Sequence, residues 1–525
     1  MLNRIRFLLG WSAIGIVIGT PCLAMAGGFD YSDHGALALS RGSAFVARAD
    51  DPTALYYNPA GIARLKGTHI LFNGSLLQED IRYQRWVFAD GKRIDRYPND
   101  QGVRMPEVAN TNGAFPTPFV AITSDLGVLR PYNLVLMAGF YGPNSHGSRT
   151  FPRYCKPGVS PCVPTDSSGL PSPARYEKVS LDSLVIYPSL GLAWEVIKGL
   201  RIGGVFQLGY STLGYSTVIA GFKNEDPFTD IDVRFEAKSS PTATGIVGLH
   251  WSPFAWLELG ASLRFGLVFT VDGEICIGER DGDKCQFPEE TTENLYKRFG
   301  FKVKPEPNPA EATLEIPMPW VVRTGARYIH RDNQERELFD VELDFVWEST
   351  SSLQDFMMKP KEPVQLFIGE SGTVFSTVRD LPVIHGWEDS WSLRLGGSYN
   401  IHGLLGEAVL SFHGGGLYET PVIPEKYTRL DFVALERWGL TAGFGVRWRK
   451  YELNFGYAHL FHVQRLVAPP EGTPECGEGV SEPCGSAVHQ IVPLIPGKDK
   501  SGGPIGNGVY RVAIDEWTLG LKAAF

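Results

Sequence analysis

The last ten residues of the chain, Glu516-Trp-Thr-Leu-Gly-Leu-Lys-Ala-Ala-Phe525, alternate large apolar side chains with small or polar ones. A period of two is typical of a β-strand whose two faces meet different surroundings. The same alternation recurs over residues 435–449 and 450–464. A soluble β-sandwich also alternates, but its strands are short, whereas these run about ten residues or more and end in aromatic side chains. The pattern predicts the lipid-facing wall of a transmembrane β-barrel.

The first 26 residues predict an export signal. Arg4 and Arg6 precede an apolar run, and Ala24-Met25-Ala26 provides a cleavage site, so the mature chain is expected to begin at Gly27. Lipidation at Cys22 is not expected, because Pro21 precedes it where a small residue is needed. No later stretch approaches the roughly 20 apolar residues of a membrane-spanning helix. We therefore expect a closed barrel in the bacterial outer membrane, since a barrel satisfies its backbone groups between strands.

The alternation predicts an all-β, antiparallel barrel of about 14 strands. Connections alternate in length, with tight turns expected at Lys198-Gly199, Pro253-Phe254, His402-Gly403 and Arg449-Lys450, and long links near 79–114, 143–182, 273–310, 350–389 and 465–508. Short turns belong to the periplasmic side of such barrels and long loops to the outside. The expected strands lie near 68–78, 115–125, 133–142, 183–196, 200–219, 231–250, 255–272, 311–329, 336–349, 390–401, 404–418, 435–449, 450–464 and 509–525.

Six cysteines fall into local pairs within the predicted outer loops. An exported protein with such pairs is expected to form short-range disulfides that brace these loops. Metal binding is the alternative, but no histidine accompanies the pairs at ligand spacing, and no metal or cofactor is expected. The pairs are Cys155 with Cys162, Cys276 with Cys285, and Cys476 with Cys484.

The period assigns wall and lumen faces. Along residues 257–269 the odd positions, Leu257 to Phe269, are expected to face lipid, and Glu258, Gly260, Ser262, Arg264 and Gly266 to face the lumen. Arg323 and Arg327 are then expected to lie across a hairpin from Asp340, Glu342 and Asp344. Such opposed inward charges usually fill and stiffen a barrel, and a role in binding a ligand carboxylate is the alternative.

Residues 27–66 do not alternate and predict a small helical plug ahead of the barrel, which occupies residues 67–525. Asp51-Pro52 resembles a helix start, and Asn58-Pro59 is expected to end that helix. The start Gly28-Phe29, the stretch S-R-G-S-A-F-V-A-R-A-D-D-P-T-A-L-Y-Y-N-P-A-G over residues 40–61, and the terminal Phe525 together resemble the FadL family of outer-membrane transporters.

That resemblance implies passive uptake of long-chain fatty acids or other hydrophobic compounds, without enzymatic activity. Ligand would be captured among the outer loops, pass to an apolar lumen pocket above the plug, and leave sideways through a kinked third strand. The expected plug and gating residues are Gly28, Phe29, Asn58, Pro59, Ala60 and Gly61; the expected lateral opening is Gly139, Gly142 and Pro143; and the expected capture residues are Leu295, Tyr296, Phe299 and Phe301.

Both motifs also have a purely structural interpretation. Asn58 to Gly61 is then a turn that seats the plug, and Gly142-Pro143 simply ends a strand. The expected partners are hydrophobic small molecules, outer-membrane lipid and lipopolysaccharide, and the barrel-assembly machinery through Phe525. A nucleic-acid partner is not expected, because the net charge is −9. The protein is expected to be a monomer.

Two other functions compete. A general diffusion porin would have no plug. An outer-membrane lipid hydrolase would need a nucleophile and a histidine, and Ser411 and His413 share an inner face, although the sequence offers no third partner. A structural or adhesive role of the large outer loops is also compatible with transport.

Overall fold

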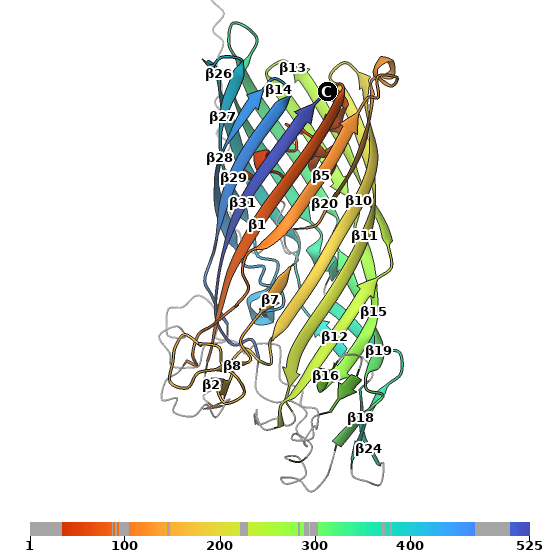
Figure 1. Cartoon of the computed structure of the whole chain (residues 1–525), viewed down its shortest axis with the longest axis vertical. Helices are drawn as coiled ribbons and strands as arrows, with labels where there is room; N and C mark the ends of the chain where they lie inside the picture. The colour runs from red at the N-terminus through yellow and green to blue at the C-terminus, as the bar shows by residue number, and fades with distance from the viewer. Residues whose placement is uncertain are drawn as a thin grey trace, which may run out of the picture.

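The chain folds into a closed antiparallel barrel of 14 strands (Figure 1). The computed structural model describes residues 34–86, 88–89, 92–93, 104–143, 147–220, 229–281, 284–287, 293, 303–353, 355–368, 373–378, 381–467 and 505–525. Three barrel strands are split in two, and the others are single. In chain order they are β1 (Thr68–Arg85), β5 (Phe115–Ser124), β6 (Leu134–Tyr141), β10 (Ser180–Ile197), β11 (Leu200–Ile219), β12 with β13 (Ile231–Ser239, Thr242–Phe254), β14 with β15 (Leu257–Arg264, Leu267–Ile277), β19 with β20 (Ala310–Met318, Val321–Arg331), β21 (Glu337–Glu348), β26 (Ser390–Leu405), β27 (Ala408–Glu419), β28 (Arg437–Trp448), β29 (Tyr451–His462) and β31 (Gly508–Ala524).

The first and last strands close the barrel. β1 pairs with β31 from His69 opposite Ala524 to Arg85 opposite Gly508. The Phe525 amide donates to the Thr68 carbonyl at 2.8 Å, and the Thr68 amide donates to the Phe525 carbonyl at 3.0 Å. The alternating C-terminal stretch is therefore the strand that closes the barrel against β1.

Short turns and long loops gather at opposite ends of the molecule, which we call the short-turn end and the long-loop end (Figure 1). The loops carry the remaining elements. These are β2 (Phe88–Ala89), β3 (Lys92–Arg93), β4 (Val108–Ala109), β7 (Ser148–Thr150), β8 (Tyr154–Cys155), β9 (Leu170–Pro171), β16 (Glu279–Asp281), β17 (Lys284–Gln286), β18 (Val303–Glu306), β22 (Asp355–Pro360), β23 (Val364–Ile368), β24 (Thr373–Val378), β25 (Leu381–Ile384), β30 (Arg465–Val467), and the 3₁₀ turns η2 (Arg130–Tyr132), η4 (Thr350–Leu353) and η5 (Glu425–Tyr427).

Two of the four predicted tight turns lie where the sequence placed them, at Lys198-Gly199 and Arg449-Lys450. The turn predicted at Pro253-Phe254 falls after Phe254, because β13 continues through both residues. The turn predicted at His402-Gly403 was wrong: β26 continues to Leu405, and a register shift between His402 and Leu405 absorbs the glycine before the chain turns.

The outer face carries an apolar belt. Outward side chains such as Leu249, Trp251, Leu343, Leu395 and Leu519 are between 46% and 53% exposed, while their neighbours along each strand point inward. Such a belt on a closed wall is the arrangement that lipid requires. Among the described residues, no helix is long and apolar enough to cross a membrane.

Three neighbouring strands reverse their facing partway along. Breaks fall between β12 and β13 at residues 240–241, between β14 and β15 at 265–266, and between β19 and β20 at 319–320. On the short-turn side of the breaks the apolar residues face outward; on the long-loop side they face inward, and residues such as Glu236, Glu274 and Glu315 face outward. The facing predicted for Leu267 and Phe269 was therefore wrong: both are buried in the lumen, because a break of this kind moves every following side chain to the other face.

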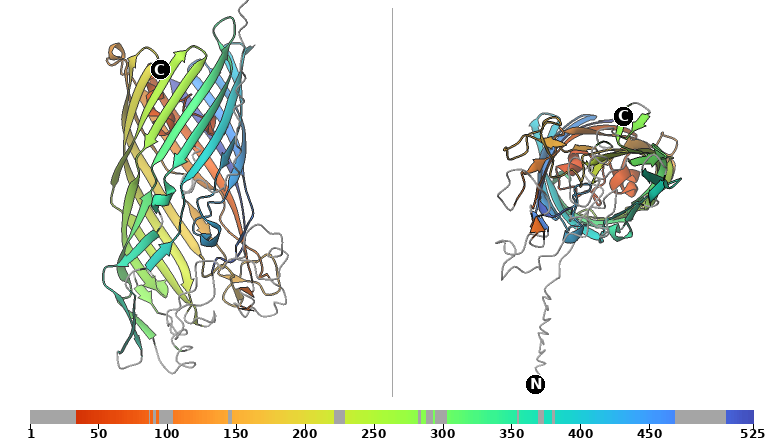
Figure 2. Two further views of the ribbon diagram at one scale, coloured as in Figure 1. Left: turned by 180° about the vertical axis from the view of Figure 1, so that it is seen from behind. Right: turned by 90° about the horizontal axis from the view of Figure 1, so that it is seen from below.

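The plug occupies the lumen toward the short-turn end (Figure 2). Its helices are α1 (Ala36–Leu39) and α2 (Ala54–Tyr57), followed by the 3₁₀ helix η1 (Pro59–Arg64). As expected, the helix after Asp51-Pro52 ends at Asn58, whose side chain accepts a hydrogen bond from the Ala60 amide. Gly28 and Phe29 lie outside the described residues.

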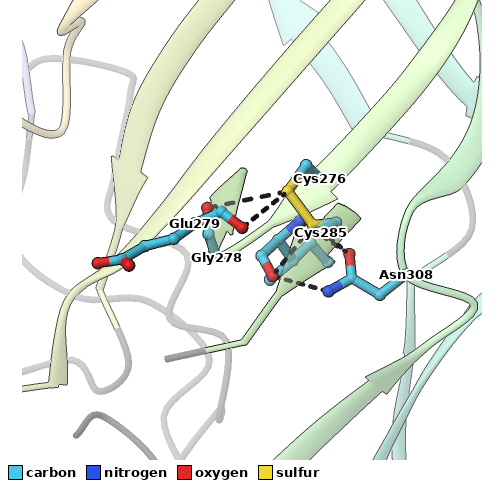
Figure 3. The surroundings of a disulfide bond; sticks show 6 residues. Cys276, Gly278, Glu279, Cys285 and Asn308 are labelled. Atoms are coloured by element: carbon cyan, nitrogen blue, oxygen red, sulfur yellow. Dashed lines mark hydrogen bonds between the residues drawn. A yellow bond between two sulfur atoms is a disulfide. The ribbon is translucent and has the colours of Figure 1, made fainter. Parts of the chain in front are cut away.

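Two of the predicted disulfides are present in the loops, Cys155–Cys162 and Cys276–Cys285. The second ties the end of β15 to β17, where the Asn308 side-chain amide also donates to the Ile277 carbonyl at 2.9 Å (Figure 3). Cys476 and Cys484 lie outside the described residues.

Candidate functional site

The plug lies directly against inward glycines of the wall. A Cβ atom on any of them would come within 2.7 Å of a plug atom. This close approach is available only where the wall residue has no side chain. The contacts join Gly203 to Pro59, Gly248 to Asn58, Gly260 to Val46, Gly396 and Gly415 to Arg41, Gly443 to Ser40, and Gly456 to Ala36.

The Asn58-Pro59-Ala60-Gly61 turn is part of this seat. The Asn58 side-chain amide donates to the Val46 carbonyl within the plug at 2.9 Å and to the Leu249 carbonyl of the wall at 3.0 Å. Gly61 lies so close to Ala49 that a Cβ would sit 2.3 Å from its carbonyl oxygen. The geometry fits the structural interpretation of this motif.

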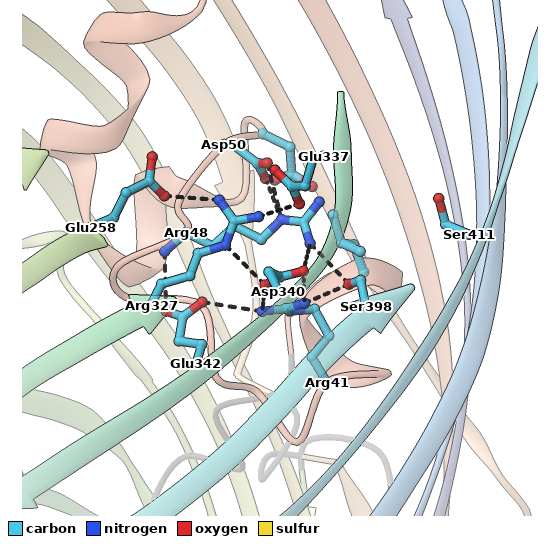
Figure 4. Close-up of polar contacts among 12 residues, drawn as sticks. Arg41, Arg48, Asp50, Glu258, Arg327, Glu337, Asp340, Glu342, Ser398 and Ser411 are labelled. Atoms are coloured by element: carbon cyan, nitrogen blue, oxygen red, sulfur yellow. Dashed lines mark hydrogen bonds and ion pairs between the residues drawn. The ribbon is translucent and has the colours of Figure 1, made fainter. Parts of the chain in front are cut away.

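Charges on β21 fix the other side of the plug (Figure 4). Asp340 accepts from Arg41 at 2.6 Å, from Arg48 at 3.2 Å and from Arg327 at 2.9 Å. Glu342 accepts from the amides of Ala47 and Arg48, and Asp344 from those of Phe45 and Val46, at 2.7–3.1 Å. The predicted inward carboxylates thus bind the plug as well as the wall.

Buried apolar side chains fill the part of the lumen between the plug and the long-loop end, and we call this region the apolar chamber. The three reversed half-strands line it with side chains that are at most 8% exposed, and rings from β6 and β10 complete it. Apolar surface removed from water in this way stabilises a bound hydrocarbon by about 25 cal/mol per Å². The lining includes Phe235, Phe269, Val271, Ile275, Leu314, Ile316, Met318, Tyr141 and Tyr187.

Arg323 lies at the floor of this chamber, on the plug side of the break between β19 and β20. Its side chain is fully buried, and none of the described residues accepts a hydrogen bond from its three guanidinium nitrogens. The guanidinium stands 4.6 Å from the ring centroid of Tyr56 in the plug. Arg264, on the neighbouring strand, stands 4.9 Å from the ring centroid of Tyr187. A buried cation without a hydrogen-bond acceptor, such as Arg323, lowers stability unless an anion pairs with it.

Among the described residues, the strand pairing beside β10 is not continuous, and we call the stretch without paired residues the wall interruption. The ladder from β6 to β10 stops at Tyr141 opposite Tyr187, and pairing resumes only where Ser148 of β7 meets Asp182. Gly139 is paired on both sides within β6, whereas Gly142 and Pro143 follow its end. A Cβ on Gly142 would sit 2.7 Å from the Val185 carbonyl oxygen of β10, so glycine allows the chain to leave the wall here.

Tyr141 stands between this interruption and the plug. Its ring packs against His34 and Tyr56 of the plug at centroid distances of 4.8 Å and 5.3 Å, and against Phe119 and Tyr187 of the wall. On this side the plug therefore meets the wall through side-chain rings.

A polar pocket of about 400 Å³ lies between the plug and strands β26 to β31, lined by residues including Arg48, Glu337, His402, His413 and Lys522. Ser411 also lines it, but its hydroxyl donates to Asn400 at 2.7 Å, while His413 Nδ1 lies 2.9 Å from the Ser398 hydroxyl. The two residues considered for a hydrolase thus engage different partners.

The sequence prediction and the site overlap in part. The predicted capture residues Leu295, Tyr296, Phe299 and Phe301 lie outside the described residues. Arg323 was singled out only as a filling charge, and nothing in the sequence separates it from the paired Arg327. The resemblance implied an apolar lumen pocket above the plug, but the residues of the chamber were not predicted, because its reversed half-strands keep the same alternation as the wall.

Solved structures share this fold. A FadL homologue from Pseudomonas aeruginosa matches 96% of this chain over 100% of its own, with a TM-score of 0.65 and 13% identity. The toluene transporters TbuX of Ralstonia pickettii and TodX of Pseudomonas putida each match 94% of this chain over 99% of their own, with a TM-score of 0.55 and 13% identity. No protein-family model matches the sequence, and no curated protein does. The resemblance read from the plug motif is thus confirmed at the level of the fold.

Proposed function

We propose that this chain is an outer-membrane channel for the passive uptake of hydrophobic molecules, and that its ligands carry an acidic head group, as long-chain fatty acids do. The long-loop end would face outward. The observation that carries the proposal is Arg323, a buried guanidinium without an acceptor among the described residues at the floor of an apolar chamber. A ligand carboxylate would form an ion pair with the Arg323 guanidinium, and the hydrocarbon tail would lie among the apolar side chains of the chamber.

Neighbouring proteins of the same fold support transport as the activity. They include a FadL homologue and two proteins named as toluene transporters. Toluene carries no charge, so those channels need no buried cation, and Arg323 is the feature that favours an acidic ligand here. A diffusion porin fits less well, because the plug fills the lumen.

Affinity measurements on the purified protein test the acidic-ligand proposal. Oleate and its neutral analogue oleyl alcohol would be titrated into the wild type and into R323M. We expect R323M to lose at least tenfold in affinity for oleate and to bind the alcohol within about twofold of the wild type, because a buried charge pair is lost only for the acid. Equal binding of both compounds by the wild type would reject the acidic head group and leave hydrophobic uptake standing. Binding of neither would reject the function.

We further propose that ligand leaves through the wall interruption beside β10. A photo-crosslinking amino acid at Leu184, which faces outward next to the interruption, should capture a radiolabelled ligand during uptake. Leu190 is the control, because it faces outward on the same strand where the ladder on both sides is complete. Equal capture at both positions would contradict lateral exit at this place.

A further inference from the structure

The connection between β27 and β28 folds back into the mouth of the barrel. The two strands pair up to Glu419 opposite Arg437, so residues 420–436, here called the gate loop, leave the wall and return to it at one point. Val422 and Leu430 are fully buried, and Leu435 is 1% exposed. Figures 1 and 2 show this segment, which contains η5, inside the outline of the barrel near β7.

The gate loop covers the apolar chamber. Val422, Ile423 and Ala434 belong to the same buried cluster as the chamber lining and the plug. Leu430 and Leu435 belong to a second cluster with Phe151, Ala174 and Tyr510, which also includes residues of β1, β27 and β29. The chamber is thus covered by the plug at one end and by this loop at the other.

Two residues that precede β10, Glu177 and Lys178, clamp the gate loop at Leu430. The Leu430 amide donates to the Glu177 carboxylate at 3.1 Å, and Lys178 donates to the Leu430 carbonyl at 3.3 Å. Glu177 and Lys178 are 1% and 0% exposed. Leu430 is therefore held at both its backbone N–H and its backbone carbonyl by neighbouring residues of a different loop.

A second contact holds the next residue. Asp431 lies 3.1 Å from His385 Nε2, and the His385 ring packs against Phe356 and Trp387 at centroid distances of 4.6 Å. His385 belongs to the connection between β25 and β26, so this contact also ties the gate loop to another loop.

The base of the loop is fixed independently. Glu419 of β27 accepts from Arg437 of β28 and from Arg394 of β26, the latter at 3.1 Å. Displacing the gate loop breaks the clamp, the His385 contact and the hydrogen bonds that Glu388 and Arg465 donate to the Val422 and Ile423 carbonyls, but it leaves the strand ladder below Glu419 intact. The described contacts thus divide into a fixed base and a releasable tip.

We propose that residues 420–436 form an outer gate that closes the chamber at the long-loop end and moves outward to admit ligand. This inference rests on the proposed function, since a gate matters only if ligand passes. A closed cover buried to this degree must open before a hydrocarbon tail can reach the chamber.

A reversible lock tests the gate. Cysteines at His385 and Asp431 would be joined by oxidation, and oleate uptake would be measured before and after reduction. We expect the lock to slow uptake at least tenfold and reduction to restore it. The matched control replaces Glu311 and Lys361, an exposed pair 3.0 Å apart on the outside of the same end. The wild type treated identically controls for the native disulfides. Unchanged uptake by the locked protein would overturn the gate while leaving the uptake proposal intact.

A second measurement needs no ligand and no lock. A single cysteine at Val422 should react with a water-soluble maleimide at least tenfold faster than one at Leu55, which is equally buried but lies in the plug. Equal rates would show that the loop stays closed and would overturn the gate. Failure of the wild type to bind oleate or oleyl alcohol would instead reject the proposed function.

Discussion

Single glycines determine how closely the plug approaches the wall. Gly414 and Gly415 are neighbours on β27, yet their surroundings differ completely. A Cβ on Gly415 would lie 2.3 Å from the Arg41 carbonyl carbon, whereas one on Gly414 would meet only the Thr441 carbonyl oxygen at 3.9 Å. The two positions look alike in the sequence, but only the inward one, Gly415, must lack a side chain for the plug to fit.

We predict that Gly415→Ala displaces the plug and Gly414→Ala does not. The barrel should fold in both variants, because the ladder of β27 does not depend on either Cβ. Limited proteolysis should cut residues 40–48 in Gly415→Ala and spare them in Gly414→Ala and in the wild type. Equal protection in the three proteins would contradict a backbone-tight seat at Gly415.

Arg323 and Arg327 show what sequence alone cannot decide about a site. Both are inward arginines on one strand, predicted to oppose the same carboxylates. Arg327 contacts Glu258, Glu337 and Asp340, whereas no described residue accepts a hydrogen bond from the Arg323 guanidinium, which stands over the Tyr56 ring. The difference depends on contacts between distant segments, which leave no local signal in the sequence.

This difference predicts opposite effects on stability. Arg327→Met removes a buried cation that Glu258, Glu337 and Asp340 share and should lower the free energy of unfolding by about 3–5 kcal/mol. Arg323→Met removes an unpaired buried charge and should leave stability unchanged or raise it. Urea unfolding in detergent, followed by tryptophan fluorescence, measures both. A comparable loss in the two variants would show that Arg323 has a structural partner.

Among the elements, the strands were predicted well and their facing only in part. The count, the alternation and the closure by residues 509–525 follow from a period of two. The reversal within β14–β15 was missed because Phe265-Gly266 interrupts the phase without interrupting the apolar character: Leu263 faces lipid, and Leu267 faces the chamber. No charged residue signalled the reversal, because Asp272 and Glu274 fall on the phase that was predicted to face the lumen.

The gate loop is the element whose stability should depend on pH. Burial raises the pKa of the Glu177 carboxyl to about 7, and Asp431 adds to this effect, while Arg429, Arg85 and the Leu430 amide oppose it. The Tyr510 hydroxyl also donates to the carboxyl. A carboxyl with a raised pKa stabilises the closed loop fully below its unfolded pKa of about 4.5, and this contribution is lost as the pH rises through 7.

Hydrogen exchange measures this dependence. After correction for intrinsic rates, peptides covering residues 428–434 should exchange faster relative to the plug at pH 8 than at pH 5.5. Glu177→Gln cannot ionise and should remove most of the difference. A pH response that survives this substitution would assign the titration to another group.

At the scale of the whole molecule, the chamber is closed by two independent covers in series, the plug and the gate loop. Neither cover contributes to the ladder that closes the barrel, so each can open without unfolding the wall. The sequence predicted the first cover from its lack of alternation. It did not predict the second, because a long connection between two strands looks the same whether it projects outward or folds inward.

Two covers in series predict that ions pass only when both are opened. Because Glu419 pairs directly with Arg437, residues 421–435 can be replaced by Asn-Gly as a two-residue hairpin. In planar bilayers we expect the wild type, this loop-excised variant and Gly415→Ala each to conduct little, and the combination of the two changes to give stable conductance steps. Steady steps from the loop-excised variant alone would show that the plug does not seal the lumen. Steps from Gly415→Ala alone would show that the gate loop does not seal the lumen. With only one cover open, ions can pass only if the other cover is not closed.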